Sequence, residues 1–305
     1  MITFQGVGKT YSPLLGKRVR AVDGMTFSVA AGEVFGIAGP NGAGKSTMIS
    51  MLLGFLPPTD GTITIDGTEP RVFVEREGIG YVSELVAINP RWRARDALAR
   101  FALLAGLSGG EVERAVAEVA TLLALEEHAG KRVKELSKGT AQRLALGQSL
   151  LGDARLVVFD EPTHGLDPLW MQRFRELVPT LRRADRAIVI ASHNLDELGR
   201  LADRVAIVDR GHLQRIVEMR GAGAAAVASR YRIVVRGGAS AVDGCFPGAV
   251  PIGNDEREVA VESLESLNAA LAALIARGTT IVSVAPAHSS LEEHFRQVVA
   301  DGGAS

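Results

Sequence analysis

Nine residues near the start of the chain have the types and spacing of a phosphate-binding loop. Residues 39–47 read G-P-N-G-A-G-K-S-T and contain the complete pattern G-x-x-x-x-G-K-S. Glycines allow a tight turn in which consecutive backbone N–H groups point at one anion. The lysine adds a positive charge for the β and γ phosphates, and the serine hydroxyl can bind Mg²⁺. The residues predicted to bind a nucleoside triphosphate here are Gly39, Pro40, Asn41, Gly42, Ala43, Gly44, Lys45, Ser46 and Thr47.

The residues around this loop provide the strand–loop–helix context that phosphate binding requires. An apolar run at 34–38 precedes it and is typical of a buried strand, and residues 48–53 after it predict the start of a helix. A helix N-terminus carries unpaired N–H groups and a partial positive charge, so it attracts phosphate. A glycine-rich turn before a helix is the alternative. We favour nucleotide binding because both the pattern and its context are complete.

Two carboxylates follow a second apolar strand. The run Leu156–Phe159 is apolar throughout, as expected for a central parallel strand covered on both faces, and leads directly into Asp160 and Glu161. Ligands bind at the carboxyl ends of such strands. We expect Asp160 to bind Mg²⁺ through water and Glu161 to act as general base toward an attacking water. Adjacent acids at a strand end can also form a solvated turn, but beside a complete phosphate loop they predict hydrolysis.

A histidine and a tyrosine complete the side chains predicted at this edge of the sheet. The apolar strand at 187–191 ends just before His193, so its ring could donate a hydrogen bond to the γ-phosphate. Tyr11 follows the first predicted strand and is expected to present its aromatic face to a purine. A structural histidine and a tyrosine packed beside a loop are the alternatives. Glu161, His193 and Lys45 are thus the predicted catalytic residues.

A second helix start also has the composition of an anion-binding site. In L-S-K-G-T at 136–140, Ser137 stands at the N-cap position and Gly139 lies close by. A simple helix cap is the alternative. However, one chain holds one γ-phosphate at its own loop, so a second phosphate-seeking helix end predicts that these residues complete the site of another subunit.

The β segment predicted at the start of the chain contains a segment that imitates the phosphate loop. G-V-G-K-T at 6–10 has Thr3 in place of the opening glycine, and the sequence after it predicts no helix. We therefore do not expect this segment to bind nucleotide.

The pattern of apolar residues divides the chain into two domains. Residues 1–218 alternate β and α patterns, with a helical insertion at about 90–150, which predicts an α/β nucleotide-binding domain. The stretch 219–229, rich in glycine and alanine, is a predicted linker. Residues 230–305 are expected to form a small C-terminal α+β accessory domain.

This accessory domain has its own sequence of predicted elements. Strands are predicted near 231–235, 258–261 and 280–284, and a helix at 264–276. A last helix is expected to begin at Ser290, with Glu293 completing its capping box. None of these residues suggests a catalytic role.

Composition argues against several classes of protein. The chain has 305 residues, a formal net charge of −1 and one cysteine, Cys245, so a nucleic-acid surface as main partner and an internal disulfide framework are not expected. The N-terminus lacks the pattern of a signal peptide, and no run of about eighteen apolar residues is long enough to span a membrane. Any role at a membrane therefore requires a partner.

The motifs together resemble those of the ATPase subunit of an ATP-binding cassette (ABC) transporter. Residues 39–47 match the Walker A motif, 136–140 the signature, 156–160 with Glu161 the Walker B motif, and His193 the switch histidine. The resemblance covers residues 1 to about 218 and implies a P-loop NTPase fold, with a RecA-like core, an antiparallel β subdomain and the helical insertion. It also implies that two subunits dimerise head to tail around two MgATP molecules.

The resemblance also assigns roles to residues that the motifs alone leave open. Tyr11 matches the aromatic residue that stacks on adenine, and Asp167, in the turn Gly165–Pro168, joins the nucleotide-binding residues. Glu84 stands where the family has a glutamine, and its carboxylate can approach Mg²⁺ and the attacking water. Mg²⁺ is thus expected at Ser46, Asp160 and Glu84.

The signature departs from the usual L-S-G-G-Q. It keeps Ser137 and Gly139, which the resemblance implies touch the γ-phosphate of the partner, while Lys138 and Thr140 replace other residues. This form resembles single-cassette exporters with separate membrane subunits. A closer-looking L-S-G-G-E at 107–111 lies too far before Asp160 for the family, so we expect Ser108 and Glu111 to form a capping box instead.

The resemblance implies an ATPase that couples dimer closure and hydrolysis to transport, with export favoured, through a separate integral-membrane subunit. In relatives the segment corresponding to 82–95 receives that subunit. The dimer would be a homodimer or a heterodimer with a related cassette, placed on the cytoplasmic, inner face of the cell membrane. The alternative is a soluble or membrane-associated ABC ATPase with a regulatory or maturation role and no transport.

Overall fold

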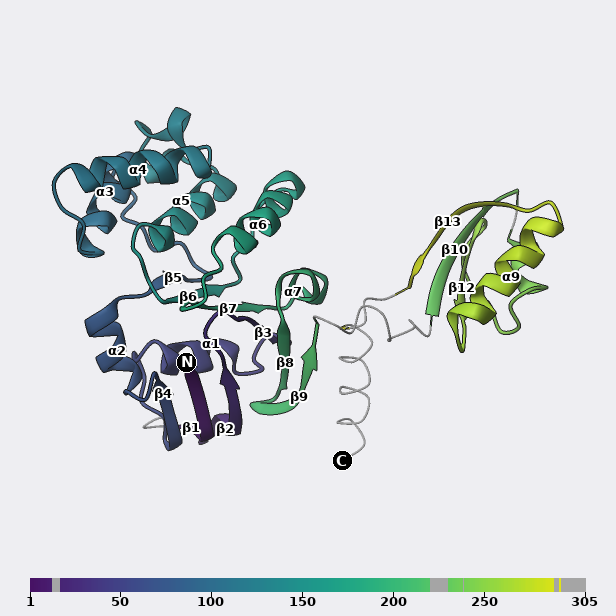
Figure 1. Ribbon diagram of the computed structural model, residues 1–305, viewed down its shortest axis with the longest axis horizontal. Coiled ribbons are helices and arrows are strands. Elements are labelled where there is room, and N and C mark those ends of the chain that lie inside the picture. The colour runs from purple at the N-terminus through teal and green to yellow at the C-terminus, as the bar shows by residue number, and fades with distance from the viewer. Residues whose placement is uncertain (13–16, 220–229, 238, 288–290, 292–305) are drawn as a thin grey trace. The chain divides into compact units, whose positions relative to one another are not determined.

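The computed structural model describes residues 1–12, 17–219, 230–237, 239–287 and 291. The chain divides into two compact units, Met1–Glu218 and Met219–Ser305 (Figure 1). The predicted linker and the predicted last helix lie outside the described residues, apart from Met219 and Leu291.

Six strands form the central sheet of the first unit. Their order is β5 (Gly80–Val82), β6 (Leu156–Asp160), β7 (Ala187–Ser192), β3 (Val34–Ala38), β8 (Arg204–Asp209) and β9 (His212–Glu218). All neighbours pair in parallel except β8 and the edge strand β9. Because β3, β7 and β6 are adjacent and parallel, the phosphate loop, His193 and the two carboxylates leave the sheet at one edge.

The three central strands are buried along their whole length, as their continuous apolar sequences predict. A second sheet of three antiparallel strands, in the order β2 (Val19–Val29), β1 (Ile2–Tyr11) and β4 (Asp60–Ile65), packs on the same core. Phe4, Phe27 and Phe35 stack between the sheets, with ring centroids 4.5 and 5.3 Å apart. The segment 6–10 lies inside β1 and is not a loop.

Helices cover the central sheet and form the predicted insertion. Helix α1 (Lys45–Leu52) follows the phosphate loop and buries Met48, Ile49 and Met51 in the core. The insertion comprises α3 (Ala94–Leu104), α4 (Gly110–Leu122), 3-10 turns at Glu126–His128 and Val133–Glu135, and α5 (Lys138–Leu150). Figure 1 shows α3, α4 and α5 together at one end of this unit and β1, β2 and β4 at the other.

Three more helices complete the first unit: α2 (Pro70–Glu77), α6 (Pro168–Thr180) and α7 (Leu195–Leu201). Helix α2 was not predicted from the sequence. The expected capping box in the insertion forms only in part, because Glu111 accepts from the Ser108 backbone N–H at 3.1 Å but Gly109 is the N-cap of α4. Within the described ranges, no helix combines the length and apolar character needed to cross a membrane.

The second unit is a four-stranded antiparallel sheet with helices packed on it. The strands lie in the order β11 (Val250–Gly253), β12 (Glu256–Ala260), β10 (Arg230–Arg236) and β13 (Thr280–Pro286), and the helices are α8 (Ser240–Asp243) and α9 (Leu264–Ala276). Its separate core includes Ile233, Val242, Phe246 and Leu274. The three predicted strands and the 264–276 helix are confirmed, whereas α8 and β11 were not predicted.

Candidate active site

The phosphate loop connects β3 to α1 in a conformation that requires glycine at two of its positions. A Cβ on Gly39 would lie 2.3 Å from the Val208 carbonyl oxygen, and one on Gly44 would lie 2.5 Å from that of Ala21. Gly44 also has a φ of +103° and is the N-cap of α1, where no side chain caps the helix. The first-turn N–H groups of α1 therefore have no partner within the helix and are available to an anion.

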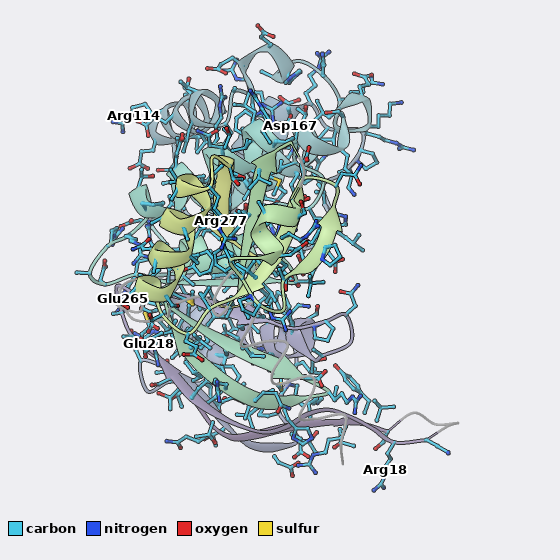
Figure 2. The ribbon with its side chains drawn as sticks, turned by 90° about the vertical axis from the view of Figure 1, so that its right-hand side faces the viewer. Arg18, Arg114, Asp167, Glu218, Glu265 and Arg277 are labelled. Atoms are coloured by element: carbon cyan, nitrogen blue, oxygen red, sulfur yellow. The ribbon has the colours of Figure 1, made fainter. Side chains whose placement is uncertain are left out.

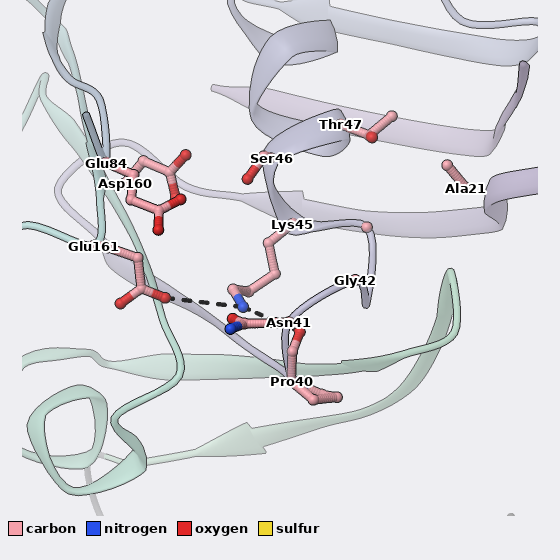
Figure 3. A pocket seen from close by; sticks show the side chains of 11 residues that line it. Ala21, Pro40, Asn41, Gly42, Lys45, Ser46, Thr47, Glu84, Asp160 and Glu161 are labelled. Atoms are coloured by element: carbon pink, nitrogen blue, oxygen red, sulfur yellow. Dashed lines mark hydrogen bonds and ion pairs between the residues drawn. The ribbon is translucent and has the colours of Figure 1, made fainter. Parts of the chain in front are cut away.

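A cavity of about 260 Å³ opens over this loop (Figure 3). It gathers residues from the loop, from β2, from the segment after β5 and from the end of β6. The residues that line it are Ala21, Pro40, Asn41, Gly42, Gly44, Lys45, Ser46, Thr47, Glu84, Asp160 and Glu161. The structure thus brings together most of the loop residues and three of the four carboxylates that the sequence predicted at the nucleotide, the exception being Asp167.

Lys45 is buried at the centre of this cavity and is held by the loop itself. Its Nζ donates to the carbonyl oxygen of Gly39 at 2.7 Å and to that of Pro40 at 3.2 Å, and lies 3.9 Å from Glu161 Oε1. Figure 3 shows its side chain reaching back over the loop toward Asn41 and Pro40. The ammonium group is therefore fixed where a phosphate seated on the loop would meet it.

The raised pKa of Asp160 indicates that the cavity favours a bound cation. Its pKa is raised to about 6, mainly by burial and then by the neighbouring carboxylates of Glu161 and Glu84, while Lys45 and a hydrogen bond from Ser46 act in the opposite direction. Three acids thus share one cavity with a single lysine. Such excess negative charge favours the binding of a hard cation.

The donor set fits Mg²⁺ bound jointly with phosphate. Among the described residues no group of three or more His, Cys, Asp or Glu side chains could hold a metal ion on its own. Ser46 and Asp160 offer one hydroxyl and one carboxylate, and Mg²⁺ typically takes one or two such ligands and completes its shell with water and phosphate oxygens. When bound, the ion would neutralise charge on the phosphates. The roles of Ser46, Asp160 and Glu84 stay predictions.

Glu161 is held firmly in an unusual backbone conformation. Its φ is +50°, in the left-handed region, which costs a non-glycine residue about 1 kcal/mol. Its carboxylate accepts from the Ser192 hydroxyl at 3.1 Å and from the His193 backbone N–H at 2.9 Å. The carboxylate is 8% exposed and lines the cavity beside Lys45. This placement suits a group that orients and deprotonates a water at the phosphate.

His193 contacts Glu161 directly and does not line the cavity. Its Nδ1 lies 2.9 Å from Glu161 Oε2, and the ring is 61% exposed. When Nδ1 donates to the carboxylate, Nε2 of a neutral ring can only accept. Donation from Nε2 to a γ-phosphate therefore requires a cationic ring or a rotated one.

Tyr11 lies at the margin of the site. It is 42% exposed, and its hydroxyl is 3.5 Å from the Thr47 hydroxyl oxygen at the end of the phosphate loop. The Lys9 ammonium lies 5.9 Å from the centroid of the Tyr11 ring, and Tyr11 is not among the residues that line the cavity. Stacking of this ring on a base stays a prediction.

The signature residues form a separate group with the turn that follows Glu161. Ser137 caps α5 by accepting from Thr140 N at 3.2 Å. Lys138 Nζ lies 3.1 Å from His164 Nε2, and its stem covers Gly165, where a Cβ would lie 2.7 Å from Lys138 Cε. Ser137, Gly139 and Asp167 do not line the cavity, and Asp167 caps α6 through Trp170 N.

Two residues at the site were not assigned a role from the sequence. Ser192 donates to the carboxylate of Glu161, and its position directly before His193 at a strand end was the available signal. Ala21 lines the cavity from β2, far away in the sequence, and no local pattern marks it.

Comparison with known proteins identifies relatives of this chain. The family model described as "ABC transporter" matches residues 22–164. The Nod factor export ATP-binding protein I of Mesorhizobium japonicum is 37% identical over 212 residues, which cover 69% of this chain and 61% of that protein. The linearmycin resistance ATP-binding protein of Bacillus subtilis is 34% identical, covering 70% of this chain and 68% of that protein. The chain thus spans about three fifths of the length of the Mesorhizobium relative.

Solved structures share the fold of the first unit. A dimeric bacterial ABC transporter cassette superposes with a TM-score of 0.65 at 25% identity, covering 72% of this chain and all of that one. An ATP-binding cassette in a post-hydrolysis state, bound to ADP and Pi, gives 0.67 at 24% identity with the same coverage. The predicted P-loop fold is therefore confirmed, and so is the predicted family resemblance.

Proposed function

Because this chain belongs to the ABC transporter family, we propose that it binds and hydrolyses ATP and thereby drives export through a separate integral-membrane subunit. The proposal concerns the reaction, the partner and the location on the inner face of the cell membrane. The alternative of a regulatory ATPase without transport has no observation in its favour.

The observation that carries the proposal is the shared cavity of Lys45, Asp160 and Glu161. The loop N–H groups and Lys45 would hold the phosphates, and Ser46 and Asp160 would hold the accompanying Mg²⁺. Glu161 would take the proton of the attacking water while Ser192 and the His193 backbone keep its carboxylate oriented. His193 would donate to the γ-phosphate, and Tyr11 would stack on the adenine.

The position of the signature supports a dimer of cassettes. Ser137 and Gly139 lie outside the cavity of their own chain, so a second chain would have to supply them to close over the nucleotide. A cassette of similar fold was solved as a dimer. We propose a head-to-tail arrangement in which Asp167 joins the same interface and Glu84 senses the bound nucleotide.

The direction of transport is inferred from relatives. Proteins named for Nod factor export and for linearmycin resistance are each more than 30% identical to this chain. Both names describe removal of a compound from the cell or protection against one. We propose export for this chain as well, with the cargo chosen by the membrane subunit.

The glutamine variant of Glu161 tests the hydrolytic assignment. We expect Glu161→Gln to bind ATP with nearly wild-type affinity, to lose ATPase activity by about 100-fold or more, and to accumulate as an ATP-bound dimer. Nucleotide affinity, phosphate release and gel filtration with ATP measure these three properties.

The matched control is Glu176→Gln, which removes an exposed carboxylate of α6 that accepts a hydrogen bond from Gln172 at 3.0 Å. It should leave all three properties unchanged. Wild-type turnover in Glu161→Gln would show that the base is another group. Transport itself is tested by asking whether a membrane protein encoded beside this chain copurifies with it.

A further inference from the structure

A lysine at the start of α5 packs against the turn that follows Glu161. Lys138 Nζ lies 3.1 Å from His164 Nε2. The stem of the same lysine covers Gly165, where a Cβ would lie 2.7 Å from Lys138 Cε and 2.9 Å from Lys138 Cδ. The usual signature L-S-G-G-Q has a glycine in place of this lysine and therefore no side chain that could make either contact. Both contacts depend on the particular sequence of this chain.

Two further contacts fix this part of α5 relative to Glu161. The buried amide of Gln142, one helical turn further along, donates to the Pro162 carbonyl oxygen at 3.1 Å. The His164 backbone N–H donates to the Glu161 carbonyl oxygen at 3.1 Å. The start of α5, and with it the cap residue Ser137, is therefore held in a defined position beside the residue predicted to be the general base.

The contact between Lys138 and His164 defines the protonation state of the imidazole. A lysine ammonium donates hydrogen bonds and cannot accept them, so His164 Nε2 must be the acceptor. An imidazole that accepts at Nε2 carries its one proton on Nδ1 and is uncharged. Protonation of Nε2 would remove the acceptor and bring two positive charges face to face. The contact therefore requires a neutral His164.

Two other charged groups lie in this region, and both face α6. Asp167, labelled in Figure 2, ends the turn and accepts from Trp170 N at 2.9 Å. The Arg143 guanidinium lies 4.3 Å from the centre of the Trp170 ring. In the part of the chain that the structure describes, neither group forms a hydrogen bond or an ion pair with His164. Lys138 is thus the charged group that a protonated His164 would meet, and both side chains are exposed to solvent.

From this contact we infer that His164 is a positioning residue for the ATP-driven pairing of two chains. In its neutral form it holds Lys138 and the start of α5, and so sets the orientation in which Ser137 and Gly139 meet the nucleotide of a second copy. The inference rests on the proposed function, in which these two residues complete the site of that copy. Acidification should release the start of α5 and weaken the dimer.

The test compares dimer formation of the full-length protein with saturating MgATP at about pH 8 and about pH 6, a range in which imidazole changes its charge. Every protein carries Glu161→Gln, so that ATP is not consumed, and sedimentation velocity at several protein concentrations gives the dissociation constant of the dimer. Asp160, whose pKa is raised to about 6, also titrates in this range. The quantity compared is therefore the change with pH in each variant against the same change in the parent.

Two substitutions separate the hydrogen bond from the charge. His164→Gln keeps an oxygen that can accept from Lys138 and that does not titrate in this range. Lys138→Met keeps an apolar stem over Gly165 without the ammonium group. Both positions are exposed, so both variants should fold. The matched control is His212→Gln, which removes another exposed imidazole of the same unit, 3.8 Å from Asp23.

The change from about pH 8 to about pH 6 should weaken the parent dimer and the His212→Gln dimer about tenfold more than the His164→Gln dimer. One exposed contact contributes a few-fold, and a symmetric dimer contains two of them. At about pH 8 the His164→Gln dimer should match the parent within about twofold, because its hydrogen bond is kept. Lys138→Met should already be about tenfold weaker than the parent at about pH 8, and acid should weaken it no more than it weakens His164→Gln.

The outcomes distinguish this inference from the proposed function. Equal pH dependence in the parent and in His164→Gln would overturn the inference alone, and so would a Lys138→Met dimer as stable as the parent at about pH 8. Absence of an ATP-dependent dimer from every protein at about pH 8 would overturn the proposed dimer and the inference with it.

Discussion

At the scale of single residues, Asp160 shows that a residue placed to bind a ligand can lower the free energy of unfolding of the protein without that ligand. Its pKa is about 6 in the fold against an ordinary value of 3.8, so the folded protein binds this proton more tightly than the unfolded chain. By linkage, stability falls as the pH rises from about 4 through 6, and by about 2–3 kcal/mol in total.

Asp160→Asn should remove this penalty. In a metal chelator and without nucleotide, we expect the variant to be more stable than the wild type at pH 7.5 by about 2 kcal/mol, with the difference vanishing near pH 4. Urea unfolding at the two pH values measures it, and the variant should also lose Mg²⁺-dependent nucleotide binding. A variant less stable than the wild type at pH 7.5 would contradict the assigned cause of the shift.

Single residues also show which parts of the site can be predicted from the sequence and which cannot. Lys45, Asp160 and Glu161 were predicted because motif spacing fixes their type and their place at strand ends, and the structure gathers them in one cavity. Ala21 could not be predicted, because it reaches the cavity only through the packing of β2 beside the phosphate loop, where its carbonyl oxygen lies next to Gly44. The contact of Lys138 with His164 likewise depends on how α5 packs beside the turn after Glu161.

At the scale of elements, the phosphate loop shows two different reasons why a position requires glycine: a positive φ, and a lack of space for a Cβ. Gly42 and Gly44 both have positive φ values, +82° and +103°. A Cβ would meet nothing within 4 Å at Gly42, but would clash with the Ala21 carbonyl oxygen at Gly44. Alanine in place of Gly42 therefore strains only the backbone. Alanine in place of Gly44 also pushes β2 and the loop apart.

We expect Gly44→Ala to destabilise the nucleotide-free protein by about 2–3 kcal/mol and Gly42→Ala by about 1 kcal/mol. Gly44→Ala should also weaken ATP binding by about tenfold or more, since it displaces the start of α1. Thermal unfolding without nucleotide and ATP titration measure the two effects. Equal destabilisation by both variants would mean that the contact with Ala21 relaxes without cost.

Element prediction succeeded where burial imposes a clear pattern and failed where it does not. The buried strands β3, β6 and β7 contain continuous apolar runs, and the 264–276 helix is closed by Gly278, so both kinds were predicted. Strand β11 was missed because all four of its residues are exposed and one is a proline. Helix α2 buries only Phe73, which leaves no helical stripe to detect.

At the scale of the whole molecule, the two units have separate hydrophobic cores, which makes their stabilities separable. Leu274 is fully buried in the core of the second unit. Leu274→Ala should destabilise that unit by about 2–5 kcal/mol through lost contacts and the cavity left behind. Because the predicted nucleotide site lies within the first unit, we expect ATP affinity to change by less than about twofold.

Thermal unfolding with and without ATP distinguishes the two units in this variant. The transition of the second unit should move to lower temperature, while the transition that ATP raises should keep its wild-type midpoint, since a ligand stabilises only the unit that binds it. Loss of ATP affinity would show that the units are coupled. If affinity is kept but ATP-dependent dimerisation weakens, the second unit contributes to the dimer.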